Sequence, residues 1–152
     1  MEKRVDVSYT QLCVFRADLD EPFNDWEPTH VAQGFAWREG SVSFRTFENG
    51  GHRVVVREQD DPPSLASETV RAIVVPFDVP EEGRVEVASI ADGFELVLPA
   101  GPHALTCEIG ERKGASWCRL TFVRTEHVEP AVLRCDDLLA PPEELLMRAT
   151  SA

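Results

Sequence analysis

Apolar and polar residues alternate along most of this chain, and turn residues interrupt the alternation at short intervals. Successive side chains of a β-strand point to opposite faces, so a period of two predicts strands that bury one face. The first such segment is RVDVSYTQLCVF at 4–15, which reads as alternating strand throughout. SVSFRTF at 41–47 and HRVVVRE at 52–58 follow, and the intervening NGG at 49–51 predicts a hairpin between them.

The second half of the chain continues the pattern, with Gly, Pro and Asp between the apolar runs. The longest run, TVRAIVVPFDV at 69–79, predicts a central strand that bulges at Pro76 or leaves that side unpaired, because proline lacks the amide hydrogen. Many short strands separated by turns predict an all-β fold, an antiparallel β-sandwich or open barrel, and the length of 152 residues predicts one domain over 1–152. The remaining predicted strands are 84–90, 94–99, 103–109 and 117–124.

Helical signals are confined to two short pieces. The first lies near 28–34, with Thr29 as its N-cap and Gly34 as its stop. The second covers 141–148 within a C-terminal stretch at 136–152, where two prolines precede two glutamates and Arg148 follows. Prolines at a helix start, acids in the first turn and a base in the last turn all suit the helix dipole. The sequence therefore predicts a short C-terminal helix and tail.

The charge of the chain limits its partners. It carries 27 Asp and Glu against 15 Lys and Arg, a formal net charge of −12. Such a field repels nucleic acid and anionic membranes and speeds association with basic proteins. The N-terminus lacks the apolar core of a secretory signal, and the AIVV run at 72–75 is far too short to span a bilayer. We therefore expect a cytoplasmic protein with a basic protein partner, no direct nucleic-acid contact and no membrane contact.

The cysteines and histidines do not follow a metal-binding pattern. None of the four cysteines forms a C-x-x-C pair, and Cys13, Cys107 and Cys118 sit inside apolar strand-like runs. They are expected to be small buried residues with free thiols. No two of the four histidines fall at i,i+2 or i,i+4. No metal ligand set and no cofactor are therefore predicted.

Catalytic motifs are equally thin. GASWC at 114–118 lacks the second glycine of a nucleophile elbow and precedes a strand, so it reads as a turn. Adjacent carboxylates such as Asp60-Asp61 and Glu81-Glu82 point to opposite faces of an extended chain and do not form an acid–base pair. We expect no catalytic residues and no enzymatic activity.

One segment, 16–30, combines acids with aromatic residues. Aromatic anchors within a charged rim are typical of protein-binding surfaces. The opposing interpretation is that Phe23 and Trp26 plug the end of the sandwich while the acids merely face water. Both interpretations stay open on the sequence. The predicted partner-binding residues are Asp18, Asp20, Glu21, Asp25, Trp26 and Glu27.

Several segments, in this order, together resemble the competence protein J family over roughly residues 6–107, with gaps at 48–68. The resemblance implies a small cytosolic protein that binds and silences a nuclease, as the inhibitor of the bacterial DNA-entry nuclease in that family does. It supplies no catalytic residues, and it marks Tyr9, Trp26, Pro76, Phe77, Pro99 and Gly101 as turn and core residues. The segments are SYTQLCVF (8–15), DW (25–26), GFA (34–36), VSF (42–44), VPFDV (75–79), EVASI (86–90) and LPAGPHALTC (98–107).

Acidity and resemblance point to the same function. A nuclease needs a basic groove for phosphate, and an acidic protein can occupy that groove. The expected function is therefore an acidic inhibitor or immunity-type protein that blocks a nuclease by protein–protein contact. The alternative is a non-enzymatic β-sandwich module that binds a peptide or a carbohydrate. An enzyme whose site is assembled across strands is a third class, for which a buried histidine beside two carboxylates would be the evidence.

Overall fold

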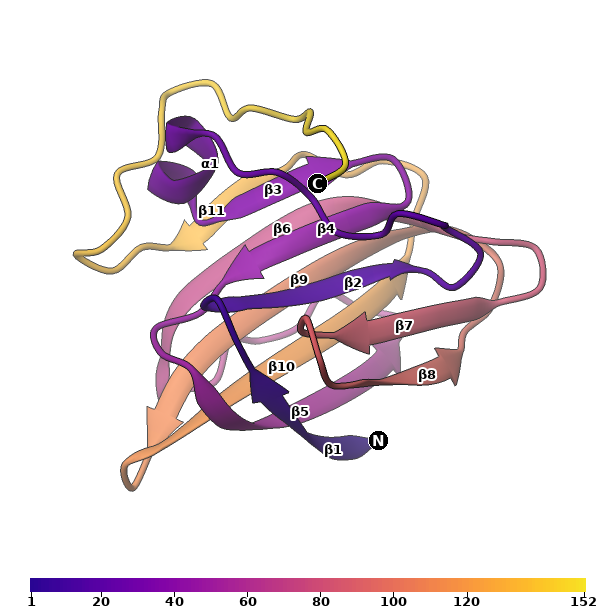
Figure 1. The fold of residues 1–152 in the computed structure, drawn as a ribbon. Helices are drawn as coiled ribbons and strands as arrows, with labels where there is room; N and C mark the ends of the chain where they lie inside the picture. Colours follow the sequence, from indigo (N-terminus) through magenta and orange to yellow (C-terminus); the bar gives the residue numbers. More distant parts are fainter.

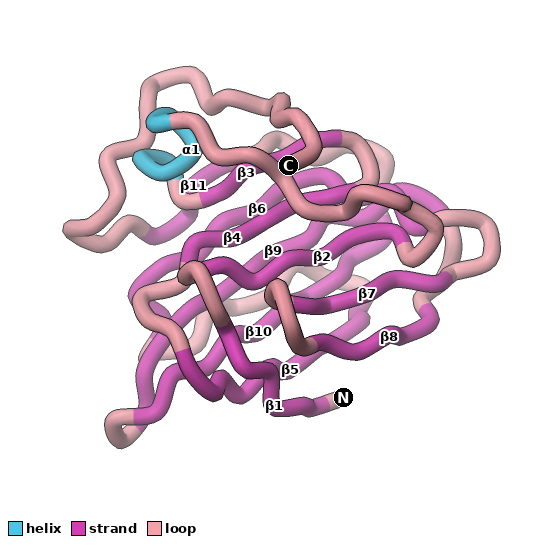
Figure 2. Tube along the Cα trace, viewed as in Figure 1, coloured by secondary structure: helices cyan, strands magenta, loops and turns pink.

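The computed structural model describes residues 1–152 and consists almost entirely of strands, with one short helix (Figures 1 and 2). No helix is both long and apolar enough to cross a membrane. The all-β prediction is confirmed. In chain order the elements are β1 (Glu2–Val7), β2 (Gln11–Arg16), α1 (Pro28–Gln33), β3 (Phe35–Arg38), β4 (Ser41–Arg45), β5 (Gly50–Gln59), β6 (Thr69–Val79), β7 (Arg84–Ala88), β8 (Gly93–Val97), β9 (Gly101–Arg112), β10 (Ala115–Arg124) and β11 (Ala131–Arg134).

The strands form two sheets that enclose one main core. Sheet A has the order β1-β5-β10-β9-β6-β11, and sheet B has the order β3-β4-β2-β7-β8. Figure 1 looks through sheet B onto sheet A. The core takes every second residue of the facing strands, such as Leu12 and Val14 from β2 and Leu120 and Phe122 from β10. The period of two in the sequence thus becomes the inward face of each sheet.

The predicted hairpin at NGG is wrong, because β4 and β5 lie in different sheets. Gly50 has φ 103°, a value that disfavours any side chain, and it opens β5 as the chain leaves sheet B for sheet A. There β5 pairs antiparallel with β1 and parallel with β10, where Val56 lies opposite Leu120. Sheet A is therefore mixed, and the purely antiparallel prediction is corrected.

The segment at 4–15 is also two strands, not one. β1 belongs to sheet A and β2 to sheet B. The chain turns between them at Tyr9 and Thr10, whose φ values are 54° and 47°, and the Gln11 N–H donates to Ser8 O at 3.3 Å. Two successive positive φ values are the mark of a type I′ turn, which the sequence did not announce because that turn normally carries Asn-Gly.

The short helix forms where predicted, with a different N-cap. Glu27 caps it instead of Thr29, and Pro28 occupies its first turn, where a missing amide hydrogen has no effect. Gly34 ends the helix with φ 89°, as predicted. Near Gly34 the two terminal carbons of Leu139 approach to 3.0 and 3.1 Å of the position that a Cβ would take.

The predicted helix at 141–148 is wrong, because these residues form an irregular segment that passes α1 (Figure 1). Their backbone groups bond to other parts of the molecule: the Leu146 N–H donates to Gln33 Oε1, and Arg148 O accepts from His30. Tertiary hydrogen bonds thus replace the intrahelical ones that local propensity favoured.

Pro76 does not disturb its strand. It stays in register opposite Ala104 of β9, and the register shift of β6 lies instead between Thr69 and Arg71. On the other edge β11 pairs only with the stretch 72–74 of β6, so that edge is open at Pro76. Of the two arrangements that the sequence predicted, a bulge or an unpaired side at Pro76, the structure has the unpaired side.

Candidate partner-binding site

The acidic loop, residues 17–27, joins β2 to α1 and runs over the outer face of sheet B (Figure 1). Phe23 packs edge-on against Phe15 of β2, with 5.8 Å between ring centroids, and Leu19 packs against the same outer cluster. Phe23 therefore packs on the outer face of sheet B and not at the end of the sandwich, where the opposing interpretation placed it. The apolar contacts hold the loop down and leave its carboxylates in water: Asp18, Asp20, Glu21, Asp25 and Glu27 are all exposed.

The five carboxylates differ in their contacts. Asp18 accepts two hydrogen bonds from the Arg16 guanidinium, at 3.1 and 2.9 Å, and this bonding lowers the pKa of Asp18. Glu21 accepts a hydrogen bond of 3.3 Å from the Ser151 hydroxyl. Asp20 and Asp25 form no side-chain ion pair, and their charges face solvent. The loop presents a net negative surface.

Asn24, which sequence reasoning missed, fixes the middle of the loop. It is 3% exposed, and its Nδ2 donates to Ala36 O at 3.0 Å and to Ser41 O at 3.3 Å. Its Oδ1 accepts from Arg38 Nε at 2.6 Å. An amide that is satisfied on both ends by β3 and β4 leaves the loop little freedom. The pattern of the sequence has no signal that separates this Asn from a surface turn residue.

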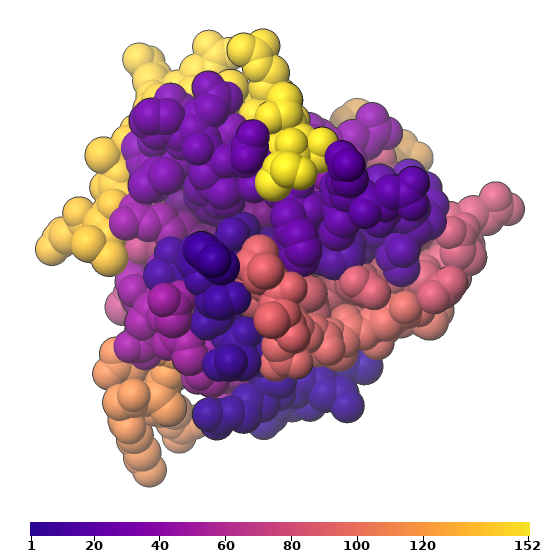
Figure 3. Space-filling view, viewed as in Figure 1, coloured from indigo at the N-terminus to yellow at the C-terminus, as the bar shows by residue number.

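The C-terminal segment, residues 135–152, holds the loop from the other side. The Asp25 N–H donates to Thr150 O at 2.8 Å, and the Ala152 N–H donates to Phe23 O at 2.9 Å. The C-terminal segment also contacts the helix. His30 Nδ1 accepts a hydrogen bond from the Glu27 N–H at 2.9 Å, so the ring hydrogen is on Nε2, which donates to Arg148 O. Figure 3 shows the yellow C-terminal residues lying against the purple surface around α1 and the loop.

Trp26 lies at the end of the loop and is half-buried. Its Nε1 donates to Gln11 Oε1 at 3.3 Å, and its ring meets His30 edge-on at 6.3 Å. It borders a hollow of about 380 Å³ that also has Tyr9, Thr10, Gln11, Val31 and Arg45 in its wall. Trp26 thus both fixes the loop and contributes to a recess beside it.

Tyr9 is a turn residue, as the resemblance implied, but it is not a core residue. It is 76% exposed, the highest value among the large hydrophobic side chains. It also sits at a positive φ, as does the β-branched Thr10 after it. A non-glycine residue held in that region costs about 1–3 kcal/mol and persists only where the surroundings enforce it.

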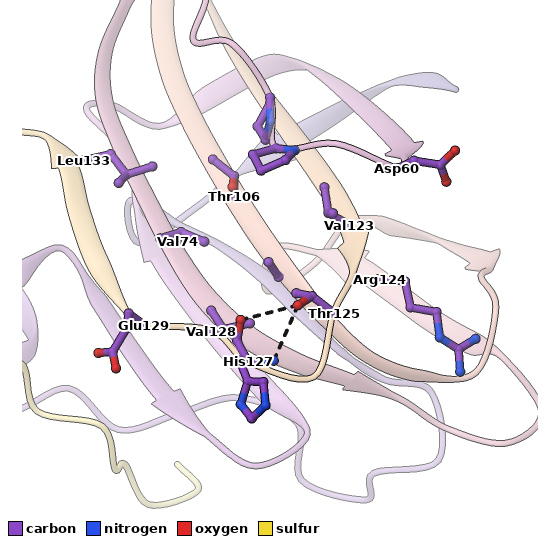
Figure 4. A pocket seen from close by; sticks show the side chains of 13 residues that line it. Asp60, Val74, Thr106, Val123, Arg124, Thr125, His127, Val128, Glu129 and Leu133 are labelled. Atoms are coloured by element: carbon purple, nitrogen blue, oxygen red, sulfur yellow. Dashed lines mark hydrogen bonds between the residues drawn. The ribbon is translucent and has the colours of Figure 1, made fainter.

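A separate groove of about 470 Å³ lies on the outer face of sheet A (Figure 4). Its floor is formed by Val74, Thr106 and Val123, with Asp60 on one side and the 125–129 stretch on the other. The Thr125 hydroxyl lies 3.4 Å from both the N and the O of His127 and holds that stretch in a turn. The groove shares no residue with the acidic loop.

Cysteine and histidine, two residue types with catalytic potential, are mostly buried in this chain. Burial raises the pKa of Cys13 and of Cys118 to about 12, and it raises that of Cys107 as well, so these thiols stay protonated at neutral pH. His52 and His103 each bond through Nδ1 to a glycine carbonyl two residues earlier, at 2.9 and 2.8 Å. Groups of three or more His, Cys, Asp or Glu that could hold a metal ion are not found.

Two buried ion pairs serve the fold. Arg71 is fully buried and bonds Asp136 through Nε at 2.7 Å and Nη2 at 2.9 Å. Glu108 is fully buried and bonds Arg119 through two nitrogens, at 2.6 and 2.9 Å. The first anchors the C-terminal segment to β6, and the second lies within sheet A beside the 60–68 loop. The surfaces open to a partner include the exposed acidic loop, the hollow at Trp26 and the groove on sheet A.

This chain resembles known proteins both in sequence and in fold. The family model of competence protein J (ComJ) matches residues 4–123, so β11 and the C-terminal segment lie outside the matched residues. A DNA-entry nuclease inhibitor of Bacillus subtilis (strain 168) is 31% identical over 110 residues, which are 69% of this chain and 78% of that protein. The crystal structure of Bacillus subtilis ComJ, described as an inhibitor of the DNA degrading activity of NucA, superposes with a TM-score of 0.73 at 24% identity, over 82% of this chain and 96% of that one. The chain belongs to the competence protein J family.

Proposed function

We propose that this protein binds a DNA-degrading nuclease and inhibits it by direct protein–protein contact through the acidic loop. The observation that carries the proposal is a loop of five exposed carboxylates held in one conformation by buried Asn24 and by the C-terminal segment. The descriptions of the matched Bacillus subtilis sequence, a DNA-entry nuclease inhibitor, and of the matched Bacillus subtilis structure, an inhibitor of NucA, support it.

The physical mechanism is competition for a basic surface. A nuclease binds DNA chiefly through cationic groups that contact phosphates. The exposed carboxylates Asp18, Asp20, Glu21, Asp25 and Glu27 would face such groups in place of phosphates, and the net charge of −12 would speed the encounter. Because the loop is already ordered, binding would lose little conformational entropy.

We further propose that the protein acts in the cytosol without enzymatic activity and without a cofactor. Buried, protonated thiols and histidines hydrogen-bonded to the backbone support a binding role over a catalytic one. Both competence regulation and immunity against a nuclease toxin use this mechanism. The two roles differ in whether the nuclease belongs to the same cell or to a competitor.

The groove over sheet A is the observation that favours the alternative, a β-sandwich module that binds a peptide. Its floor of Val74 and Val123 is apolar, and charged side chains at Asp60 and Glu129 stand at its edge. A peptide lying there would contact sheet A, not the acidic loop. The two functions therefore use different faces, and variants separate them.

The deciding experiment is inhibition of a purified nuclease of the DNA-entry type, taken from the organism that encodes this chain. The protein should suppress DNA degradation with a sharp end point at a fixed molar ratio, and association should slow as salt rises. Bovine serum albumin, another acidic protein, is the control for non-specific charge effects. Full nuclease activity at a large excess of this protein would refute the inhibitor function.

A further inference from the structure

We propose that Tyr9 is the anchor residue of the partner interface and that the hollow beside it, bordered by Trp26 and Val31, receives an apolar side chain projecting from a basic partner surface. The inference rests on the proposed inhibitor function and names the contact that would hold the partner. Tyr9 lies outside the acidic loop, on the turn between β1 and β2. In Figure 1 that turn and helix α1 both lie toward the left-hand end of the strands of sheet B.

The first support is the strained backbone of the turn, because burial of the Tyr9 side chain does not offset the cost of that strain. Tyr9 and Thr10 hold φ values of 54° and 47° in a turn suited to Asn-Gly. Strained backbone clusters at functional sites, and burial of the side chain does not offset the strain here, because Tyr9 is 76% exposed. Backbone strain that gains no burial points to a use for the side chain outside the fold.

The second support is that the surroundings hold the turn in place. Ser8 N donates to the buried Ser89 hydroxyl at 2.9 Å, and that hydroxyl donates to Ser8 O at 3.1 Å or to Gln11 O at 2.9 Å. On the other side Thr10 N donates to Asn49 Oδ1 at 2.8 Å, and Thr10 O accepts from Thr46 N at 2.8 Å. The aromatic ring is therefore presented from a fixed backbone, which lowers the entropy lost on binding.

The third support is the chemistry of the hollow. Tyr9, Trp26 and Val31 give it apolar surface, and a volume of about 380 Å³ admits a large side chain. Arg45 is also part of the wall and keeps its positive charge, but its Nη1 is held in place because it donates to Val31 O and Leu138 O, both at 3.1 Å. An apolar group in the hollow would therefore pack against Tyr9, Trp26 and Val31.

The fourth support is the charge around the hollow. Asp25 and Glu27 flank Trp26 in the chain, and both are exposed. An aromatic pair beside acidic groups matches the usual organisation of an interface, with buried aromatic anchors and a polar rim. The matching partner surface is basic at its edge and carries one apolar projection at its centre.

The experiment replaces the strained turn with its favoured sequence, Tyr9→Asn with Thr10→Gly. This double variant removes the aromatic ring and the strain together, so its thermal midpoint should rise while its affinity for the DNA-entry-type nuclease falls at least about tenfold. Tyr9→Phe keeps the ring and should retain affinity within about twofold. Val97→Ser, at a residue 72% exposed on β8, is the matched control and should bind like the parent.

Each outcome has a distinct meaning in calorimetric titration against the nuclease. Tyr9→Ser is a second variant that removes the ring without replacing Thr10. If both the double variant and Tyr9→Ser bind the nuclease as tightly as the parent, Tyr9 is not the anchor, while the inhibitor function stays intact. A parent that binds no nuclease would overturn the proposed function, and the anchor with it. A loss of affinity equal in Val97→Ser would show a general effect of apolar surface and would also overturn the assignment.

Discussion

Gln33 and Leu146 exchange two hydrogen bonds across 113 positions of the chain. The Gln33 Nε2 donates to Leu146 O at 2.9 Å, and the Leu146 N–H donates to Gln33 Oε1 at 2.9 Å. The Gln33 side chain therefore pairs with the backbone of Leu146 as a neighbouring strand would. This contact ties the C-terminal segment to the helix that follows the acidic loop.

Gln33→Met should destabilise the protein, because methionine fills the space without replacing the hydrogen bonds. Gln33 is fully buried and also donates to Phe35 O at 3.0 Å. Each buried group left unpaired costs about 1–3 kcal/mol of the free energy of unfolding, measured in urea. Gln59→Met, which removes one exposed bond to Asp61 O, is the control and should cost far less. Equal effects would contradict the role of Gln33.

Asp136→Asn should be more damaging, because it leaves a buried arginine without its counter-charge. Arg71 is fully buried and its ion pair with Asp136 is mostly shielded from solvent. Breaking such a pair costs about 3–5 kcal/mol in the free energy of unfolding. Glu95→Gln, which breaks the exposed pair with Arg84, should change stability by less than about 1 kcal/mol.

The Asp136 pair also predicts a pH dependence. Burial acts to raise the pKa of Asp136, but hydrogen bonds from Arg71 and its charge outweigh burial and hold that pKa below the ordinary 3.8. A carboxyl with a lowered folded-state pKa stabilises the protein above its ordinary pKa, and the contribution disappears as pH falls through the folded value. The stability difference between parent and Asp136→Asn should therefore shrink on acidification from about pH 6 to about pH 3. A constant difference would contradict the pairing.

Reversing charge at Asp18, Asp20 and Asp25 together should weaken nuclease inhibition with little change in thermal midpoint. All three side chains are exposed. Rim charges act mainly on the association rate, so the loss should be about tenfold at low salt and smaller at high salt. The matched control reverses Glu68, Glu111 and Glu126, which are also exposed and lie on or next to strands of sheet A. Unchanged inhibition by the first triple variant would exclude the acidic loop, and the Glu58, Asp60 and Asp61 loop would become the candidate.

Thiol reactivity should separate one cysteine from the other three. Cys135 is exposed, whereas Cys13, Cys107 and Cys118 are buried and free. Burial raises the pKa of Cys13 and Cys118 to about 12, so they should not react while the protein is folded. A thiol reagent should find one fast thiol in the native protein and four in the denatured, unreduced protein. A count of two or none after denaturation would contradict free thiols.

The predicted strands show how far local patterns reach. Alternation predicted the strands at 69–79 and 84–90 within a few residues, because the period of two is imposed by each strand on itself. Gly34 was correctly predicted as a helix stop for the same kind of reason: its φ of 89° is a local requirement that glycine meets most easily. The buried Cys13, Cys107 and Cys118 followed from the apolar runs around them.

The candidate site was only partly visible. The acids and Trp26 could be selected from composition, because a cluster of charge with an aromatic is a property of neighbouring residues. Asn24 and Tyr9 could not be selected. The importance of Asn24 comes from carbonyls on β3 and β4, and that of Tyr9 from a strained turn that distant groups at Ser89 and Asn49 hold in place.

The sequence by itself determined that this chain is all-β and strongly acidic, where most strands lie, and where its one helix stops. Tertiary structure alone decided that β5 pairs with β10 in parallel, that 4–15 divides between two sheets, and that 141–148 forms no helix. The physical reason is the same in each case. Strand and turn preferences act between neighbours, whereas strand partners and the hydrogen bonds of the C-terminal segment join residues far apart in the chain, and those contacts outweigh local preference.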